Sequence, residues 1–88
     1  MDDKDRRLIR DRLESFGDIT ELYEVTTFIG YRDLKRVTIR ILDQGEECPD
    51  PSLRFACDAT QEDGKKAGGN NAGSIDEAIG IVHWDDLD

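Results

Sequence analysis

The sequence predicts an α+β domain: a three-stranded antiparallel sheet with two helices packed on one face, in the order α-β-β-β-α. Three observations support this prediction. Apolar residues recur at a helical period near both ends of the 88-residue chain. Three segments between them alternate apolar and polar residues, as half-buried strands do. A sheet with one apolar face is buried most simply if both helices cover that face.

The length and composition favour a single folded unit spanning 1–88. Charged residues make up 38% of the chain and apolar residues 36%, which is polar for a globular domain. The apolar residues are nevertheless grouped in periodic runs, which favours a folded chain over a disordered one. A chain this short buries only about 60–65% of its unfolded surface, so we expect a thin core.

The segment 3–16 is the first predicted helix. Gly17 suits the position just after its end, where a positive φ is common. The local charges cancel, so we expect its arginines to be solvated and paired with acids one turn away; an anion-binding face is the alternative. The apolar residues form one stripe, Leu8, Ile9, Leu13 and Phe16.

Three strands are predicted over 22–31, 36–42 and 53–60, each rich in β-branched or aromatic residues. A hairpin loop of about four or five residues joins the first two strands. The connection before the third strand contains Gly45, Pro49 and Pro51, which stop either strand from continuing. Alternation within the first strand places Leu22 and Phe28 together, and we expect them on the face away from the helices.

The segment 61–73 is predicted to be a mobile loop, because its glycines, alanines and asparagines offer no large side chain to bury. Ser74 and Glu77 follow it with the spacing of a capping box, which marks a helix N-terminus. We expect a helix over 75–84. The alternative is a helix that ends near Gly80 and is followed by a short strand. Residues 85–88 are then an acidic C-terminal tail.

The inward positions of these elements predict one apolar core. Its predicted members are Leu13, Phe16, Val37, Ile39, Ile41, Phe55, Ile75, Ile79 and Val82.

Charge is distributed very unevenly along the chain. The formal net charge is −9, yet residues 1–42 carry nine acids and nine bases. Residues 43–63 carry seven acids against Arg54 alone, and residues 76–88 carry five acids and no lysine or arginine. Net charge governs association and solubility more than fold, so this asymmetry concerns partners. It argues against direct binding to nucleic acid, whose phosphates these acids would repel.

The sequence contains no recognisable catalytic, cofactor or metal motif. His83 is the only histidine, and as a general base it would lack a nucleophile at a recognisable spacing. Two cysteines and one histidine cannot supply a structural zinc site, and the acids after the third strand do not follow the order of a calcium loop. We expect Cys48 and Cys57 to be free thiols. We therefore predict no enzymatic activity, no cofactor and no bound metal.

No segment approaches the roughly 18 apolar residues of a membrane span, and the N-terminus has no apolar run after its charges. We expect a cytoplasmic protein without a membrane partner. Its oligomeric state stays open between monomer and homodimer, with Leu22 and Phe28 as a possible dimer contact.

The leading functional hypothesis is a small regulatory or adaptor protein that binds a basic surface of a partner protein. One alternative is an inhibitor that mimics nucleic acid and occupies the site of a DNA- or RNA-binding enzyme. Others are an enzyme subunit completed by a partner, and an acidic domain whose charge serves only solubility. The predicted partner-binding residues combine acids with one aromatic anchor. They are Glu46, Glu47, Asp50, Trp84, Asp85, Asp86 and Asp88.

Overall fold

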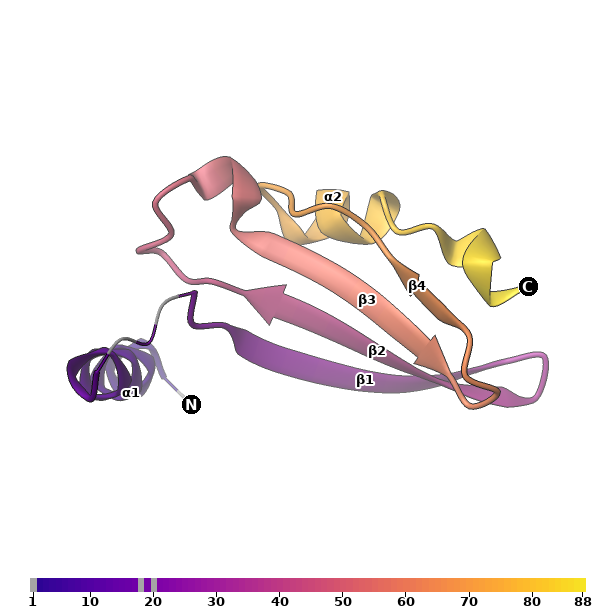
Figure 1. The fold of residues 1–88 in the computed structure, drawn as a ribbon, viewed down its shortest axis with the longest axis horizontal. Helices are drawn as coiled ribbons and strands as arrows, with labels where there is room; N and C mark the ends of the chain where they lie inside the picture. The colour runs from indigo at the N-terminus through magenta and orange to yellow at the C-terminus, as the bar shows by residue number, and fades with distance from the viewer. Residues whose placement is uncertain (1, 18, 20) are drawn as a thin grey trace.

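A four-stranded antiparallel meander forms the centre of the structure, a computed structural model that describes residues 2–17, 19 and 21–88 (Figure 1). The strands lie in the order β1-β2-β3-β4. The α+β class and the single antiparallel sheet are confirmed, but the sheet has four strands instead of three. The elements are α1 (Asp3–Ser15), β1 (Glu24–Arg32), β2 (Lys35–Asp43), the 3-10 helix η1 (Pro51–Leu53), β3 (Phe55–Gln61), β4 (Lys66–Gly68), α2 (Ile75–Gly80) and the 3-10 helix η2 (Trp84–Leu87).

The hairpin between β1 and β2 is tighter than predicted. Arg32 pairs with Lys35, so only Asp33 and Leu34 form the turn. Both have positive φ, 51° and 66°, as the two central residues of a type I′ turn do. Leu34 is 96% exposed. The strands therefore run to the turn itself, and the predicted loop of four or five residues is wrong.

The strand register decides which side chains share the face beneath α2, called the inner face below. Thr26 pairs with Ile41 and Phe28 with Ile39, and directly opposed residues of an antiparallel pair point to the same face. Phe28 is therefore on the inner face, and its predicted place away from the helices is wrong. Both alternating sets of β1 contain apolar residues, so the period alone could not tell which set faces inward.

The core lies between the inner face and the C-terminal quarter of the chain. Ala78 of α2 is completely buried, and Val82 and Leu87 continue the contact. Ile39, Phe55 and Trp84 pack against this cluster while remaining partly exposed. The buried apolar cluster is Val37, Ile41, Cys57, Ala59, Ala67, Ala72, Ala78, Val82 and Leu87.

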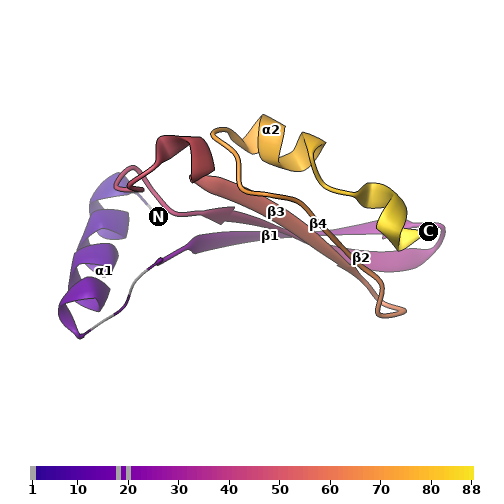
Figure 2. The same ribbon diagram turned by 45° about the horizontal axis from the view of Figure 1, so that its top comes forward.

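Helix α1 lies beyond one end of the sheet and not on its face (Figure 2). None of the residues Asp3–Ser15 is buried, and Phe16 is 73% exposed. The prediction that both helices pack on one face is therefore wrong, and so is the placement of Leu13 and Phe16 in the core. Polar contacts attach α1 instead, including an ion pair of 2.9 Å between Arg6 and Glu24.

The segment predicted to be a loop over 61–73 contains β4 and two buried alanines, Ala67 and Ala72. Ala72 and Phe55 exchange both backbone hydrogen bonds, at 2.7 and 2.9 Å. Gln61 is 2% exposed, and its Nε2 donates to the carbonyl oxygen of Leu87 at 3.1 Å. Small side chains can be buried beside a neighbouring strand without a long apolar run, which is why the composition of this segment misled the prediction.

Helix α2 begins as predicted and ends earlier. Ser74 is its N-cap, with Oγ accepting from the backbone N–H of Glu77 at 3.1 Å. The helix stops at Gly80, so the predicted continuation to Trp84 is wrong, and the alternative strand over 81–84 does not form either. The N–H of His83 donates to the carbonyl oxygen of Gly68 at 3.1 Å, which draws the chain back along β4.

Candidate functional site

An apolar groove of about 520 Å³ lies on the inner face beside α2. Every residue of its lining except Thr26 is apolar. Phe28 is 57% exposed, and Ile75 and Ile79 are 47% and 39% exposed. Side chains that the sequence assigned to the core, such as Ile75, therefore stand at an open surface. The lining is Thr26, Phe28, Ile39, Ile41, Ile75, Ile79 and Trp84.

The groove exists because α2 is placed over one half of the sheet. The inner-face residues in the middle of β3 and β4 are small, and Cys57, Ala59 and Ala67 let Ala78 approach until it is fully buried. A helix is about 10–12 Å across and strands are about 4.8 Å apart, so α2 covers about two strands. Phe28 on β1 and Ile39 on β2 lie beyond that cover.

Trp84 joins the groove to the core. Its ring is partly buried, packs against the core cluster and also lines the groove. The indole Nε1 donates to the carbonyl oxygen of Ile79 at 3.1 Å. The sequence analysis left two roles open for this ring, an anchor for a partner or a lid on the core. In the structure the Trp84 ring both packs against the core and forms part of the groove lining.

Four carboxylates adjoin the lining residues in the chain: Asp76 and Glu77 follow Ile75, and Asp85 and Asp86 follow Trp84. All four are exposed, and none makes an ion pair with any residue that the structure describes. Asp76 and Glu77 also occupy the first turn of α2, where negative charge favours the helix dipole. The two elements that contribute Ile75, Ile79 and Trp84 to the groove therefore also carry four negative charges, although none of these carboxylates is among the lining residues.

The predicted partner-binding residues do not form one surface. Glu46, Glu47 and Asp50 lie in the connection between β2 and η1, at the opposite end of the sheet from the C-terminus (Figure 1). Asp50 is engaged locally, since its Oδ1 accepts from the backbone N–H of Ser52 at 3.1 Å. Of the predicted set, Trp84 lines the groove, and Asp85 and Asp86 follow it in the chain.

Asp88 is also engaged. Its carboxylate pairs with Arg32, and its backbone oxygen accepts from Nζ of Lys65 at 2.6 Å. These contacts hold the last residue against the hairpin end of the sheet, so Asp88 serves to fix the tail.

A second, polar cleft of about 300 Å³ lies where α1 meets the sheet end. Arg6 pairs with Glu24 at 2.9 Å and Arg7 with Glu46 at 3.4 Å. Arg10 donates to the carbonyl oxygen of Leu22 at 3.2 Å and lies against Gly45, where a Cβ would come within 2.6 Å of the guanidinium. Arg6 and Arg7 are thus paired with acids and Arg10 with a backbone carbonyl, so these three arginines do not present an anion site.

Arg54 and Asp43 form the most buried ion pair of the cleft. Nε of Arg54 donates to Oδ1 of Asp43 at 2.7 Å, and their side chains are 29% and 28% exposed. Burial acts to raise the pKa of Asp43, but hydrogen bonds from Arg54 and from the N–H of Gly45 outweigh it, and the pKa is lowered. The pKa of Arg54 is raised by the same pair. Both groups are therefore charged at neutral pH.

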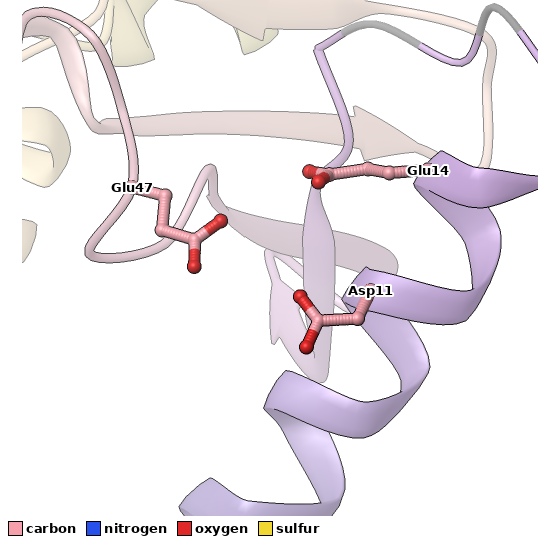
Figure 3. Close-up of side chains that lie close together, drawn as sticks. All are labelled: Asp11, Glu14 and Glu47. Carbon is pink, nitrogen blue, oxygen red and sulfur yellow. The ribbon is translucent and has the colours of Figure 1, made fainter.

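Three carboxylates, from Asp11, Glu14 and Glu47, come together between α1 and the connection after β2 (Figure 3). Their nearest oxygens all lie within 4.8 Å of one another, and all three residues are exposed. Carboxylate oxygens suit Ca²⁺ or Mg²⁺, but Ca²⁺ takes 6–8 oxygen ligands. The trio alone does not define a metal site.

His83, Cys48 and Cys57 are not among the residues that line the groove or the polar cleft. His83 is exposed and bonds β4 through its backbone. Cys48 and Cys57 are both free and buried, as predicted for free thiols. Burial, with Asp58 close by, raises the pKa of Cys57, which disfavours the nucleophilic thiolate.

Apolar periodicity does not distinguish a buried position from the lining of an open site, so the sequence did not predict the groove. Phe28, Ile39, Ile75 and Ile79 have the spacing of inward-facing residues, and the same spacing fits the lining of an open site. The one available signal was the length of the second helix. Gly80 weakens a helix by about 1 kcal/mol relative to Ala, and a helix ending there is too short to cover the whole inner face.

No protein-family model, curated protein or solved structure matches this chain. Among the helices that the structure describes, none is long and apolar enough to cross a membrane.

Proposed function

We propose that this protein is a small acidic adaptor or regulatory module, without catalytic activity, that binds a basic amphipathic helix of a partner protein. The supporting observation is the apolar groove of about 520 Å³, whose lining residues adjoin four carboxylates in the chain that form no ion pair with any described residue. Exposed apolar patches with a polar rim commonly mark interaction sites. The apolar lining would supply most of the affinity, and the carboxylates would favour basic partners.

The width of the uncovered floor supports a helix as the bound element. The open floor includes Thr26 and Phe28 of β1 and Ile39 of β2, two neighbouring strands that together present about 10 Å of sheet, although Val37 and Ile41 of β2 are buried. An α-helix with its side chains is about 10–12 Å across. Amphipathic helices bind apolar grooves through residues spaced three and four apart. A basic polar face on such a helix would be attracted by the charges of Asp76, Asp85 and Asp86.

The ion pairs of the acidic half support an adaptor over a nucleic-acid mimic. A mimic needs rows of carboxylates with their charge available. Asp43, Asp58 and Asp63 are paired with Arg54, Arg40 and Lys35 respectively, and Glu46 is paired with Arg7. More than half of the seven acids in 43–63 are thereby neutralised.

Fluorescence of Trp84, the only tryptophan, provides a direct test. The probe is a synthetic amphipathic helical peptide with leucines on one face and lysines on the other. Binding should shift the emission to shorter wavelength, and a matched peptide with glutamates in place of lysines should bind at least tenfold more weakly.

Two variants of similar exposure test the location of binding. Phe28→Ser removes a groove residue that is 57% exposed, and Leu8→Ser removes a residue of α1 that is 59% exposed. Phe28→Ser should weaken peptide binding at least tenfold, and Leu8→Ser should leave it unchanged. Equal affinities for the two variants would place binding outside the groove.

A matched pair of double variants tests how much the carboxylates contribute to peptide binding. Asp85→Asn with Asp86→Asn should reduce the salt dependence of binding, because both acids adjoin Trp84. Glu46→Gln with Glu47→Gln, at the other end of the sheet, should leave it unchanged. An unchanged salt dependence in the first variant would mean that these acids serve solvation and not recognition.

A further inference from the structure

Strand β1 is an open edge of the sheet. It pairs with β2 on one side, and among the described residues no backbone hydrogen bond is formed on its other side. Its nine residues include neither proline nor lysine, two residues that commonly protect sheet edges. A long regular edge with free N–H and C=O groups is a template for another strand.

The opposite edge of the sheet is closed. Strand β4 has only three residues, and the carbonyl oxygen of Gly68 accepts from His83 of the returning chain at 3.1 Å. Gly69 lies so close to this segment that a Cβ would come within 2.8 Å of the carbonyl oxygen of Ile81. The fold thus covers one edge with its own C-terminal segment and leaves β1 uncovered.

We propose that β1 pairs antiparallel with β1 of a second copy, about a two-fold axis at Phe28. In this register each residue faces the one equally far from Phe28 on the other strand. Glu24 then opposes Arg32, and Val25 opposes Tyr31. The remaining pairs are Thr26 with Gly30, Thr27 with Ile29, and Phe28 with Phe28.

This self-complementarity carries the proposal. Against itself, β1 places Glu24 opposite Arg32, Val25 opposite Tyr31 and Phe28 opposite Phe28, and the two threonine pairs place no like charges opposite each other. Glu24 and Arg32 also pair with Arg6 and Asp88 within each copy. Opposite charges and aromatic or β-branched pairs stabilise adjacent strands, whereas like charges destabilise them. A two-fold axis makes each of these contacts twice, except the Phe28 pair, which lies on the axis itself, as in an isologous interface.

In this arrangement the exposed side chains of β1 contact the second copy. Phe28, Ile29 and Tyr31 are 57%, 64% and 75% exposed in a single copy. In the pair, the two Phe28 rings lie side by side on the inner face and join the two grooves. Ile29 and Tyr31 contact Thr27 and Val25 of the second copy on the outer face.

Net charge opposes this association and gives it a recognisable salt dependence. Each copy carries −9, and salt screens repulsion between the copies over a Debye length of about 10 Å at 0.1 M. Self-association should therefore strengthen on going from low to moderate salt. Binding of a basic helix in the groove should weaken over the same range, so the two proposals succeed or fail independently.

Sedimentation and cysteine cross-linking test the pairing. The native chain should sediment with the mass of two chains at high concentration. Opposed residues of an antiparallel pair have Cα atoms about 4.5–5.5 Å apart, within the range that a disulfide spans. Phe28→Cys should therefore form a cross-linked dimer readily under mild oxidation. Thr38 on β2 lies three strand spacings from Thr38 of the second copy. Thr38→Cys should therefore give at least tenfold less cross-linked dimer.

A mixture of variants tests the register. Val25→Cys mixed with Tyr31→Cys should give more cross-linked dimer than either variant alone. Ile29→Lys, at an exposed position outside the groove, should restore the mass of one chain while circular dichroism stays unchanged. The proposal is overturned by a single-chain mass at every concentration and salt. It is also overturned by equal cross-linking of Phe28→Cys and Thr38→Cys, or by a mixture that reacts no better than its components.

Discussion

The indole Nε1 of Trp84 donates a hydrogen bond to the backbone carbonyl oxygen of Ile79 at 3.1 Å. Ile79 is in the last turn of α2, and its carbonyl oxygen also accepts from the backbone N–H of Val82 at 3.3 Å, so the indole adds a further bond to the same oxygen. Both side chains also line the groove. The bond therefore holds α2 and η2 together as one wall of the proposed binding site.

The N-cap of α2 should contribute measurably to stability. Ser74→Ala removes the bond from the N–H of Glu77 and should lower the free energy of unfolding by about 0.5–2 kcal/mol in a urea titration. Ser74→Asp keeps a hydrogen-bond acceptor at the same position and should retain most of the free energy of unfolding. If both substitutions cost the same, the cap is not what stabilises this end of the helix.

The two ends of the chain should differ sharply in their sensitivity to truncation. Leu87 is 2% exposed in the core cluster, so Leu87→Ala should cost about 2–5 kcal/mol of unfolding free energy. Phe16 is 73% exposed, and Phe16→Ala should change that free energy by less than about 0.5 kcal/mol. Chemical denaturation of both variants decides the matter, and a large cost for Phe16→Ala would show that α1 is packed more deeply.

The ion pair between Asp43 and Arg54 should make the free energy of unfolding depend on pH in the acidic range. The pKa of Asp43 is lowered from its ordinary value of 3.8, so the folded state favours the ionised form. The associated stability is present above pH 3.8 and is lost as pH falls from there through the lowered pKa. Unfolding free energy, measured by urea titration over this range, should decrease more for the native chain than for Asp43→Asn.

Arg54→Met provides the control for that pair. Removing the guanidinium leaves the burial of Asp43 and its bond from Gly45, so the lowering of the Asp43 pKa should diminish. The acid-dependent loss of stability should shrink accordingly, and combining the two substitutions should add nothing beyond Asp43→Asn. Additive effects would mean that the two side chains act separately.

The cysteines should resist modification in the folded state. Cys57 is 2% exposed and its pKa is raised by burial from 9.0, while Cys48 is 8% exposed. Alkylation at neutral pH should be slow without denaturant and should proceed quickly in urea. Thr60→Cys, at an exposed position of β3, should introduce one thiol that reacts at once. Rapid labelling of the native chain would contradict the burial of both thiols.

Local sequence determined the elements whose signals lie within a few residues. The hydroxyl of Ser74 three residues before the N–H of Glu77 defines a helix start, and alternation over 36–42 defines a strand. Both were predicted because the forces involved, a capping bond and a two-residue repeat, act along the chain itself. The α+β class follows from the same signals.

Tertiary structure alone decided which apolar surfaces are covered. Alternation groups Phe28 with Thr26 but does not say whether that face lies under a helix, and the stripe of α1 does not say whether the sheet has room for it. Small residues such as Ala59 and Ala67 allow α2 to pack closely over one half of the sheet. The chain then runs back along β4, and Leu87 packs in the same core cluster. The groove and the open edge are present because the short C-terminal segment covers only part of the sheet. No local sequence pattern specifies which part is covered.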